Sequence, residues 1–114
     1  GVSTSAFFRA TNCSFTNWET GVLAYGETWV NAQECRFENN TTGFHFNAVS
    51  GVVSNYSYTG NEFVDNGTAV LLESVPGDST DLTLYFDGST FSGNGTDIDN
   101  RCGQSVDISK AVFE

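Results

Sequence analysis

A repeated motif constrains the fold of this 114-residue chain more than any other feature. In each copy a Cys, Asn, Ser or Ala stands two positions before a Phe, and the first four copies continue through a short turn to apolar residues. The anchors are Phe15, Phe37, Phe63, Phe91 and Phe113, which follow one another at intervals of 22, 26, 28 and 22 residues. Periods of about 20–50 residues are typical of solenoids, propellers and other repeat arrays. Because one such repeat cannot bury its own apolar face, we expect the repeats to stack around a common core.

The residue types within the repeat favour strands. Apolar residues alternate with polar ones at period two, and Phe, Tyr, Val, Ile and Thr are plentiful, which is the chemistry of half-buried strands. No stretch of ten residues has helical spacing, so helical and leucine-rich repeats fit poorly. A propeller blade needs about 40 residues or more. One coil of a parallel β-helix therefore fits each repeat.

The repeats align into three strand zones with one inward and outward pattern. We expect the five Phe anchors and the residue two positions before each of them to point inward, since a slip of one residue would turn every anchor outward. The other predicted inward positions are Phe8, Ala10, Val30, Ala32, Tyr56, Tyr58, Leu84, Phe86, Val106 and Ile108 in the zone before the anchor, and Val22, Ala24, Phe44, Phe46, Val70, Leu72 and Ile98 in the zone after it.

An asparagine column lies three residues after the anchors. It reads Trp18, Asn40, Asn66 and Asn94. A stacked asparagine side chain can bond its own turn and the amides of neighbouring coils. We therefore predict a structural ladder of Asn40, Asn66 and Asn94, which Trp18 interrupts in the first coil.

The Phe-x-x-Asn columns resemble the right-handed parallel β-helix superfamily, the pectate-lyase-like fold. The resemblance covers nearly the whole chain at Phe37–Asn40, Phe63–Asn66 and Phe91–Asn94. It implies an all-β, right-handed parallel β-helix solenoid of about four coils of 22–28 residues, with three short strands in each coil. A shared fold carries no function by itself.

Length and charge limit the remaining choices. The length of the chain is that of a single domain, so we assign residues 1–114 to one domain. We interpret this domain as a segment of a longer protein. Four Lys and Arg stand against 14 Asp and Glu, a net charge of −10. Nucleic-acid binding needs a basic patch, and no apolar run reaches the ~18 residues of a membrane span. The many Asn, Thr, Ser and Gly residues favour a secreted or cell-surface location.

Two of the three cysteines occupy the same column. Cys13 and Cys35 are one coil apart, so stacking in register would place them about 4.8 Å from each other. That distance lies within the Cα range of a disulfide. The alternative, which we favour, is two free thiols that fill a column of small residues. Cys102 is left over in either case, and an odd count argues against a disulfide scaffold.

Two groups of residues are candidates for binding. Glu73, Asp78 and Asp81 gather near the longest connection and are candidate calcium ligands; the alternative, which we favour, is a solvated loop. Trp29, Asn31, Asn55 and Tyr85 are expected on one outward face, where an aromatic ring among amides can stack on a sugar; the alternative is packing against a neighbouring domain or subunit. His45 is expected outward in a column with Leu23, Leu71 and Asp99, and we expect no cofactor beyond calcium.

These features favour a non-catalytic β-helix module that serves adhesion, structure or glycan contact. One alternative is a fragment of a polysaccharide lyase or hydrolase that acts on acidic glycans, which would need clustered carboxylates. Another is an oligomerisation module that self-associates through open coil ends or through the face of Leu23, His45 and Leu71. A glycan or a protein partner is compatible with the first hypothesis.

Overall fold

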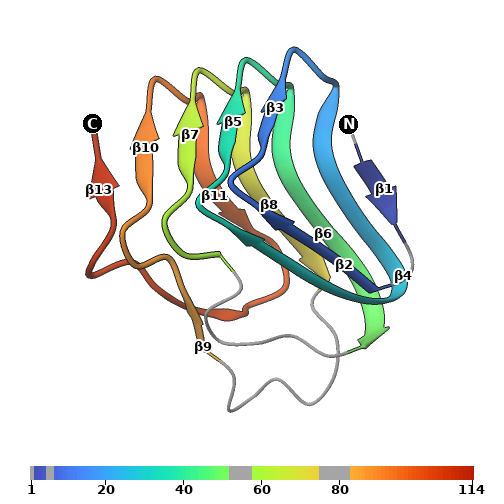
Figure 1. The fold of residues 1–114 in the computed structure, drawn as a ribbon. Helices are drawn as coiled ribbons and strands as arrows, with labels where there is room; N and C mark the ends of the chain where they lie inside the picture. Colours follow the sequence, from blue (N-terminus) through green and yellow to red (C-terminus); the bar gives the residue numbers. More distant parts are fainter. Residues whose placement is uncertain (1, 5–6, 52–57, 75–82) are drawn as a thin grey trace.

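The protein is a parallel β-solenoid of about three turns (Figure 1). The computed structural model describes the backbone of residues 2–4, 7–51, 58–74 and 83–114, and the side chains of residues 9–25, 32–47, 58–74 and 83–114. The described residues contain strands and turns and no helix. The predicted all-β parallel solenoid is confirmed.

Three parallel sheets make up the walls of the solenoid (Figure 1). The long sheet has the order β1-β4-β6-β8-β11, and β2 also pairs with β4. The anchor sheet has the order β13-β10-β7-β5-β3, and the third sheet pairs β12 with β9. The strands are β1 (Val2–Thr4), β2 (Phe7–Thr11), β3 (Ser14–Thr16), β4 (Thr20–Gln33), β5 (Arg36–Glu38), β6 (Thr42–Gly51), β7 (Glu62–Val64), β8 (Thr68–Ser74), β9 (Thr83–Tyr85), β10 (Thr90–Ser92), β11 (Thr96–Asn100), β12 (Ser105–Asp107) and β13 (Val112–Phe113).

The five anchor rings form one continuous stack inside the anchor sheet. Adjacent coils pair residue for residue, so that Phe37 lies opposite Phe63 and Phe63 opposite Phe91. Successive ring centroids, from Phe15 through to Phe113, are 5.1, 5.0, 4.8 and 4.8 Å apart, and the planes of successive rings differ by 14° or less. Parallel pairing fixes the spacing of the coils at about 4.8 Å, which is also close to the distance at which aromatic rings pack.

A second aromatic group fills the space between the sheets. Tyr58 packs edge-on against Phe44 at 4.9 Å and stacks on Phe86 at 5.7 Å. The inward residues Val22, Ala24, Phe46, Val70 and Leu72 are also buried. Burying side chains of this size contributes about 1.5–3 kcal/mol each, so the apolar columns are the main source of stability.

Two sharp turns bracket each of the strands β3, β5, β7 and β10 of the anchor sheet. The turn before the strand has a residue with positive φ at Asn12, Glu34, Gly60 and Gly88. The turn after it has one at Asn17, Asn39, Asp65 and Gly93. Gly, Asn and Asp tolerate this left-handed backbone best, which explains the composition of both columns apart from Glu34.

The coils also approach one another too closely for side chains at one position. A Cβ atom on Gly43 would lie 2.6 Å from the carbonyl oxygen of Ala69, and one on Gly21 would lie 2.5 Å from the carbonyl oxygen of Gly43. The stacking of the coils therefore favours glycine at positions 21 and 43, whereas the same column holds Ala69 in the next coil.

The structure differs from the expected pattern at several positions. Strand β4 runs from Thr20 to Gln33 and so joins two of the expected strand zones, the one after Phe15 and the one before Phe37, with a shift in its pairing to β6 between Gly26 and Glu27. Phe113 and Ile108, predicted inward, are 42% and 45% exposed, because they lie in the last described coil and are covered from one side only. Cys13, also predicted inward, is exposed in the first coil for the same reason. Phe8, Val30 and Tyr56 lie outside the described side chains.

Candidate functional site

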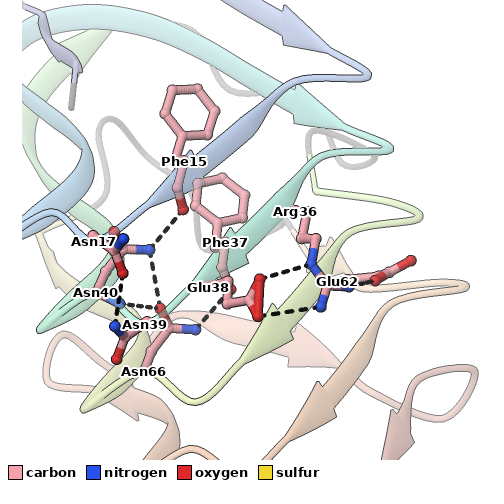
Figure 2. Close-up of polar contacts among 9 residues, drawn as sticks. All are labelled: Phe15, Asn17, Arg36, Phe37, Glu38, Asn39, Asn40, Glu62 and Asn66. Carbon is pink, nitrogen blue, oxygen red and sulfur yellow. Dashed lines mark hydrogen bonds and ion pairs between the residues drawn. The ribbon is translucent and has the colours of Figure 1, made fainter.

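A ladder of asparagine side chains runs beside the phenylalanine stack (Figure 2). Asn40 Nδ2 donates to Asn66 Oδ1, and Asn66 Nδ2 donates to Asn94 Oδ1, both at 3.0 Å. The same amide nitrogens donate back to the carbonyl oxygens of Phe15 and Phe37, at 2.9 and 3.0 Å. The ladder therefore ties every coil to the coils on either side.

The ladder also satisfies backbone amides at the turn after each anchor. Asn66 Oδ1 accepts from the backbone N–H of Asn40 at 3.0 Å, and Asn94 Oδ1 accepts from that of Asn66 at 2.9 Å. In the first coil, the N–H of Trp18 donates to Asn40 Oδ1 at 2.9 Å, while the Trp18 side chain is 51% exposed. Asn40 and Asn66 are buried, so these bonds form where water cannot replace them.

A second ladder lies at the opposite end of the anchor strands, and the sequence reasoning missed it. Asn61 Oδ1 accepts from the N–H of Cys35 at 2.9 Å, and Asn61 Nδ2 donates to the carbonyl of Ala32 at 2.9 Å. In the next coil the hydroxyl of Ser89 makes the equivalent bonds. It accepts from the N–H of Asn61 at 3.2 Å and donates to Tyr58 O at 3.0 Å. The sequence feature that could have indicated this second ladder is Asn61, which stands in a column otherwise made of Cys, Ser and Ala.

The outward side of the anchor sheet carries an ion-pair cluster (Figure 2). Arg36 Nε contacts Glu38 Oε1 at 3.2 Å within one strand, and Arg36 Nη1 contacts Glu62 Oε2 on the adjacent strand. Next to it, Asn39 Nδ2 donates to Asn17 Oδ1 at 2.7 Å between two turns. All of these side chains are exposed or half-buried, and such pairs contribute about 0–1 kcal/mol each.

The outward side of the long sheet carries a mixed polar and apolar surface, which we call the outer patch. Its described residues are Leu23, Tyr25, His45, Asn47, Leu71 and Glu73. In register across the strands, Leu23 pairs with His45 and His45 with Leu71, and Tyr25 pairs with Asn47. Tyr25 is 42% exposed, whereas Leu71, expected outward, is only 9% exposed.

His45 and Glu73 form the closest polar contact of the outer patch. His45 Nε2 lies 2.7 Å from Glu73 Oε1. The pairing of β6 with β8 shifts between Phe46 and Asn47, so that Leu72 pairs with Phe46 but Ser74 pairs with Asn47. Glu73 is thus the extra residue of an irregularity, which turns its carboxylate toward the imidazole. Regular register would not have predicted this partner.

The structure describes only some of the predicted sugar-binding residues. Trp29 and Asn31 lie on β4 and pair in register with Phe7 and Arg9, but their side chains are outside the described set. Tyr85 lies on β9, pairs with Asp107 and is half-buried. Asn55 lies outside the described residues. These four residues remain a prediction.

The predicted calcium ligands are similarly split. The Glu73 carboxylate contacts the His45 imidazole. Asp78 and Asp81 lie outside the described residues. Within the described part of the chain, no three His, Cys, Asp or Glu side chains gather closely enough to hold a metal ion.

The fold displaces the pKa values of several ionisable groups, among them Tyr58 and Asp107. Burial raises the pKa of the Tyr58 hydroxyl well above its ordinary value, and that hydroxyl has no hydrogen-bond partner in the described part of the chain. At the surface, the Ser109 hydroxyl donates to Asp107 Oδ1 at 2.6 Å and the Ser109 N–H does so at 2.9 Å. These bonds lower the pKa of Asp107.

Comparison with known proteins gives no family for this chain. No protein-family model, no curated protein and no solved structure matches it. Over the residues that the structure describes, no helix has the length and apolar character needed to cross a membrane.

Proposed function

We propose that this chain is a non-catalytic, rigid β-helix module of a secreted or cell-surface protein of the pectate-lyase-like superfamily, acting in adhesion or spacing. The observation that carries the proposal is the pair of side-chain ladders. Asn40, Asn66 and Asn94 on one side of the anchors, and Asn61 and Ser89 on the other, hold successive coils in fixed register. Such a wall resists bending and gives its outward side chains fixed positions.

The outward faces supply the contact surface of such a module. The outer patch combines an exposed Tyr25 ring with the Asn47 amide, which is its partner in register, and with the His45–Glu73 pair. Aromatic rings beside amides and carboxylates suit the apolar face and the hydroxyls of a sugar. Trp29, Asn31, Asn55 and Tyr85 are the other proposed glycan contacts. Because the chain carries a net charge of −10, we propose a neutral glycan rather than an acidic one.

A glycan array tests the proposal, with the wild-type chain, Tyr25→Ala and Trp29→Ala compared at equal folded concentration. We expect retention of the wild type on neutral glycans and weaker retention of at least one variant. Thr16→Ala, which changes an exposed side chain on the anchor sheet, is the matched control and should bind as the wild type does.

Two further measurements separate the competing functions. Release of unsaturated sugars from pectin or alginate would contradict the proposal and favour a lyase with calcium near Glu73, Asp78 and Asp81. Sedimentation that shows concentration-dependent assembly, with no glycan retained, would replace glycan contact with self-association through the coil ends or the outer patch.

A further inference from the structure

Cys13 and Cys35 occupy equivalent positions in adjacent coils. Each directly precedes a strand of the anchor sheet, and the strands pair so that Ser14 lies opposite Arg36. The N–H of Arg36 donates to the carbonyl oxygen of Cys13 at 2.9 Å. The preceding residues, Asn12 and Glu34, have nearly the same φ, 56° and 55°. The two cysteines therefore share one backbone geometry and are separated by a single inter-strand step of about 4.8 Å.

The two thiols also point the same way. Cys13 Sγ lies 3.4 Å from the carbonyl oxygen of Thr11, and Cys35 Sγ lies 3.3 Å from that of Gln33, two residues earlier in each case. Equal contacts on equal backbones place one sulfur above the other. A Cα separation of about 4.8 Å falls within the 4.4–6.8 Å range of disulfides. With no change of register, rotation of the side chains and an approach of the two Cβ atoms to about 3.5–4.5 Å bring the sulfurs together.

The two thiols differ in their access to solvent. Cys13 is exposed and Cys35 is buried. Burial raises the pKa of the Cys35 thiol. A thiolate is the reactive form of cysteine, so an external reagent meets Cys13 first, and Cys35 reacts second from inside the wall.

We propose that Cys13 and Cys35 of the folded protein form a disulfide between adjacent coils when they meet a small-molecule disulfide such as oxidised glutathione. The Cys13 thiolate attacks one sulfur of oxidised glutathione, and one glutathione thiolate leaves. The Cys35 thiolate then attacks the Cys13 sulfur of the mixed disulfide, and the second glutathione leaves. The cysteine pair loses two electrons and two protons, and one oxidised glutathione becomes two glutathione thiols.

The disulfide would cross-link the first coil of the anchor sheet to the second. It closes a loop of 22 residues, which restricts the unfolded chain. The ladder contact to the next coil survives, because Asn61 bonds the backbone N–H of Cys35 and not its sulfur. The protein thus gains stability on oxidation without rearranging its core.

Cys102 is an internal control. It is exposed after β11, and its Sγ lies 3.7 Å from Asn100 Oδ1. With no cysteine at the equivalent position of the neighbouring coil, it can accept a glutathione but has no thiol to displace it.

The test incubates the folded protein with oxidised glutathione, traps free thiols by alkylation and maps the peptides by mass spectrometry. We expect a Cys13–Cys35 link that lacks two hydrogen atoms, with glutathione on Cys102. In Cys35→Ser, glutathione should stay on Cys13; in Cys13→Ser, Cys35 should stay unmodified until the protein is unfolded. Oxidation should raise the Tm of the wild type by about 5–10 °C and that of neither variant. Wild-type Cys13 that keeps its glutathione, or links between molecules in place of the internal link, would overturn the proposal.

Discussion

Replacing Asn66 tests the ladder at its most buried point. Asn66→Ala removes four hydrogen bonds of 3.0 Å: two accepted by Oδ1 from Asn40, and two donated by Nδ2 to Phe37 O and Asn94 Oδ1. A net contribution of about 0.5–1.5 kcal/mol per bond gives about 2–6 kcal/mol. We expect a loss of about 4 kcal/mol, because the buried N–H of Asn40 also loses its acceptor. That is a large share of the about 5–15 kcal/mol that stabilises a typical domain.

Urea denaturation followed by circular dichroism measures this loss as a lower midpoint at unchanged m-value. Thr16→Ala is the control and should cost less than about 0.5 kcal/mol, because its side chain is exposed. Asn66→Asp keeps the acceptor but places a second carboxylate oxygen against the carbonyl of Phe37. It should be more damaging than alanine at neutral pH and less so in acid, where the buried carboxyl is neutral. An Asn66→Ala variant as stable as the control would refute the reasoning.

Three further predictions concern local strain and burial. Tyr58→Phe should stabilise the fold by about 1 kcal/mol, because it deletes a buried hydroxyl that has no hydrogen-bond partner among the described residues. Since the fold raises the pKa of Tyr58 above the ordinary value of 10.0, the wild type should lose stability as pH rises beyond about 10, and urea midpoints should show a smaller loss in the variant. Glu34→Gly should stabilise the fold by up to about 1 kcal/mol, measured as a higher urea midpoint, since Glu34 has a φ of 55°; a lower midpoint would contradict this. Gly43→Ala should lower the thermal midpoint by about 10 °C or more, since the new Cβ would meet Ala69 O at 2.6 Å; an unchanged midpoint would show that the coils are not so closely stacked.

The sequence predicted the parts of the fold that repeat. The Phe anchors recur at one position of each coil, and a single register then follows for the residues around them, because a slip of one residue would turn the anchor of that coil outward. The Asn column was visible for the same reason. Each coil repeats the same pattern of inward and outward residues. The agreement among the coils therefore supports the fold without a match to a known family.

The features that the sequence did not predict depend on single, non-repeated events. Glu73 meets His45 because of one irregularity in the pairing of β6 with β8. Asn61 forms a ladder with Ser89, although the two side chains differ. Leu71 is buried on a face where alternation predicts exposure. Period-two alternation carries no information on such local shifts, so the sequence predicted the column of Leu23, His45 and Leu71 but not the contact of His45 with Glu73.

The spatial proximity of Phe37 and Phe63 tests the central claim most directly. The two rings are 26 residues apart in the chain, but their centroids are 5.0 Å apart in the stack. In solution NMR on protein with labelled phenylalanine, the account predicts strong nuclear Overhauser effects between these two rings, and between Phe63 and Phe91. Absence of these signals in the folded protein, or contacts of Phe37 that indicate antiparallel pairing, would contradict the stacked-coil structure.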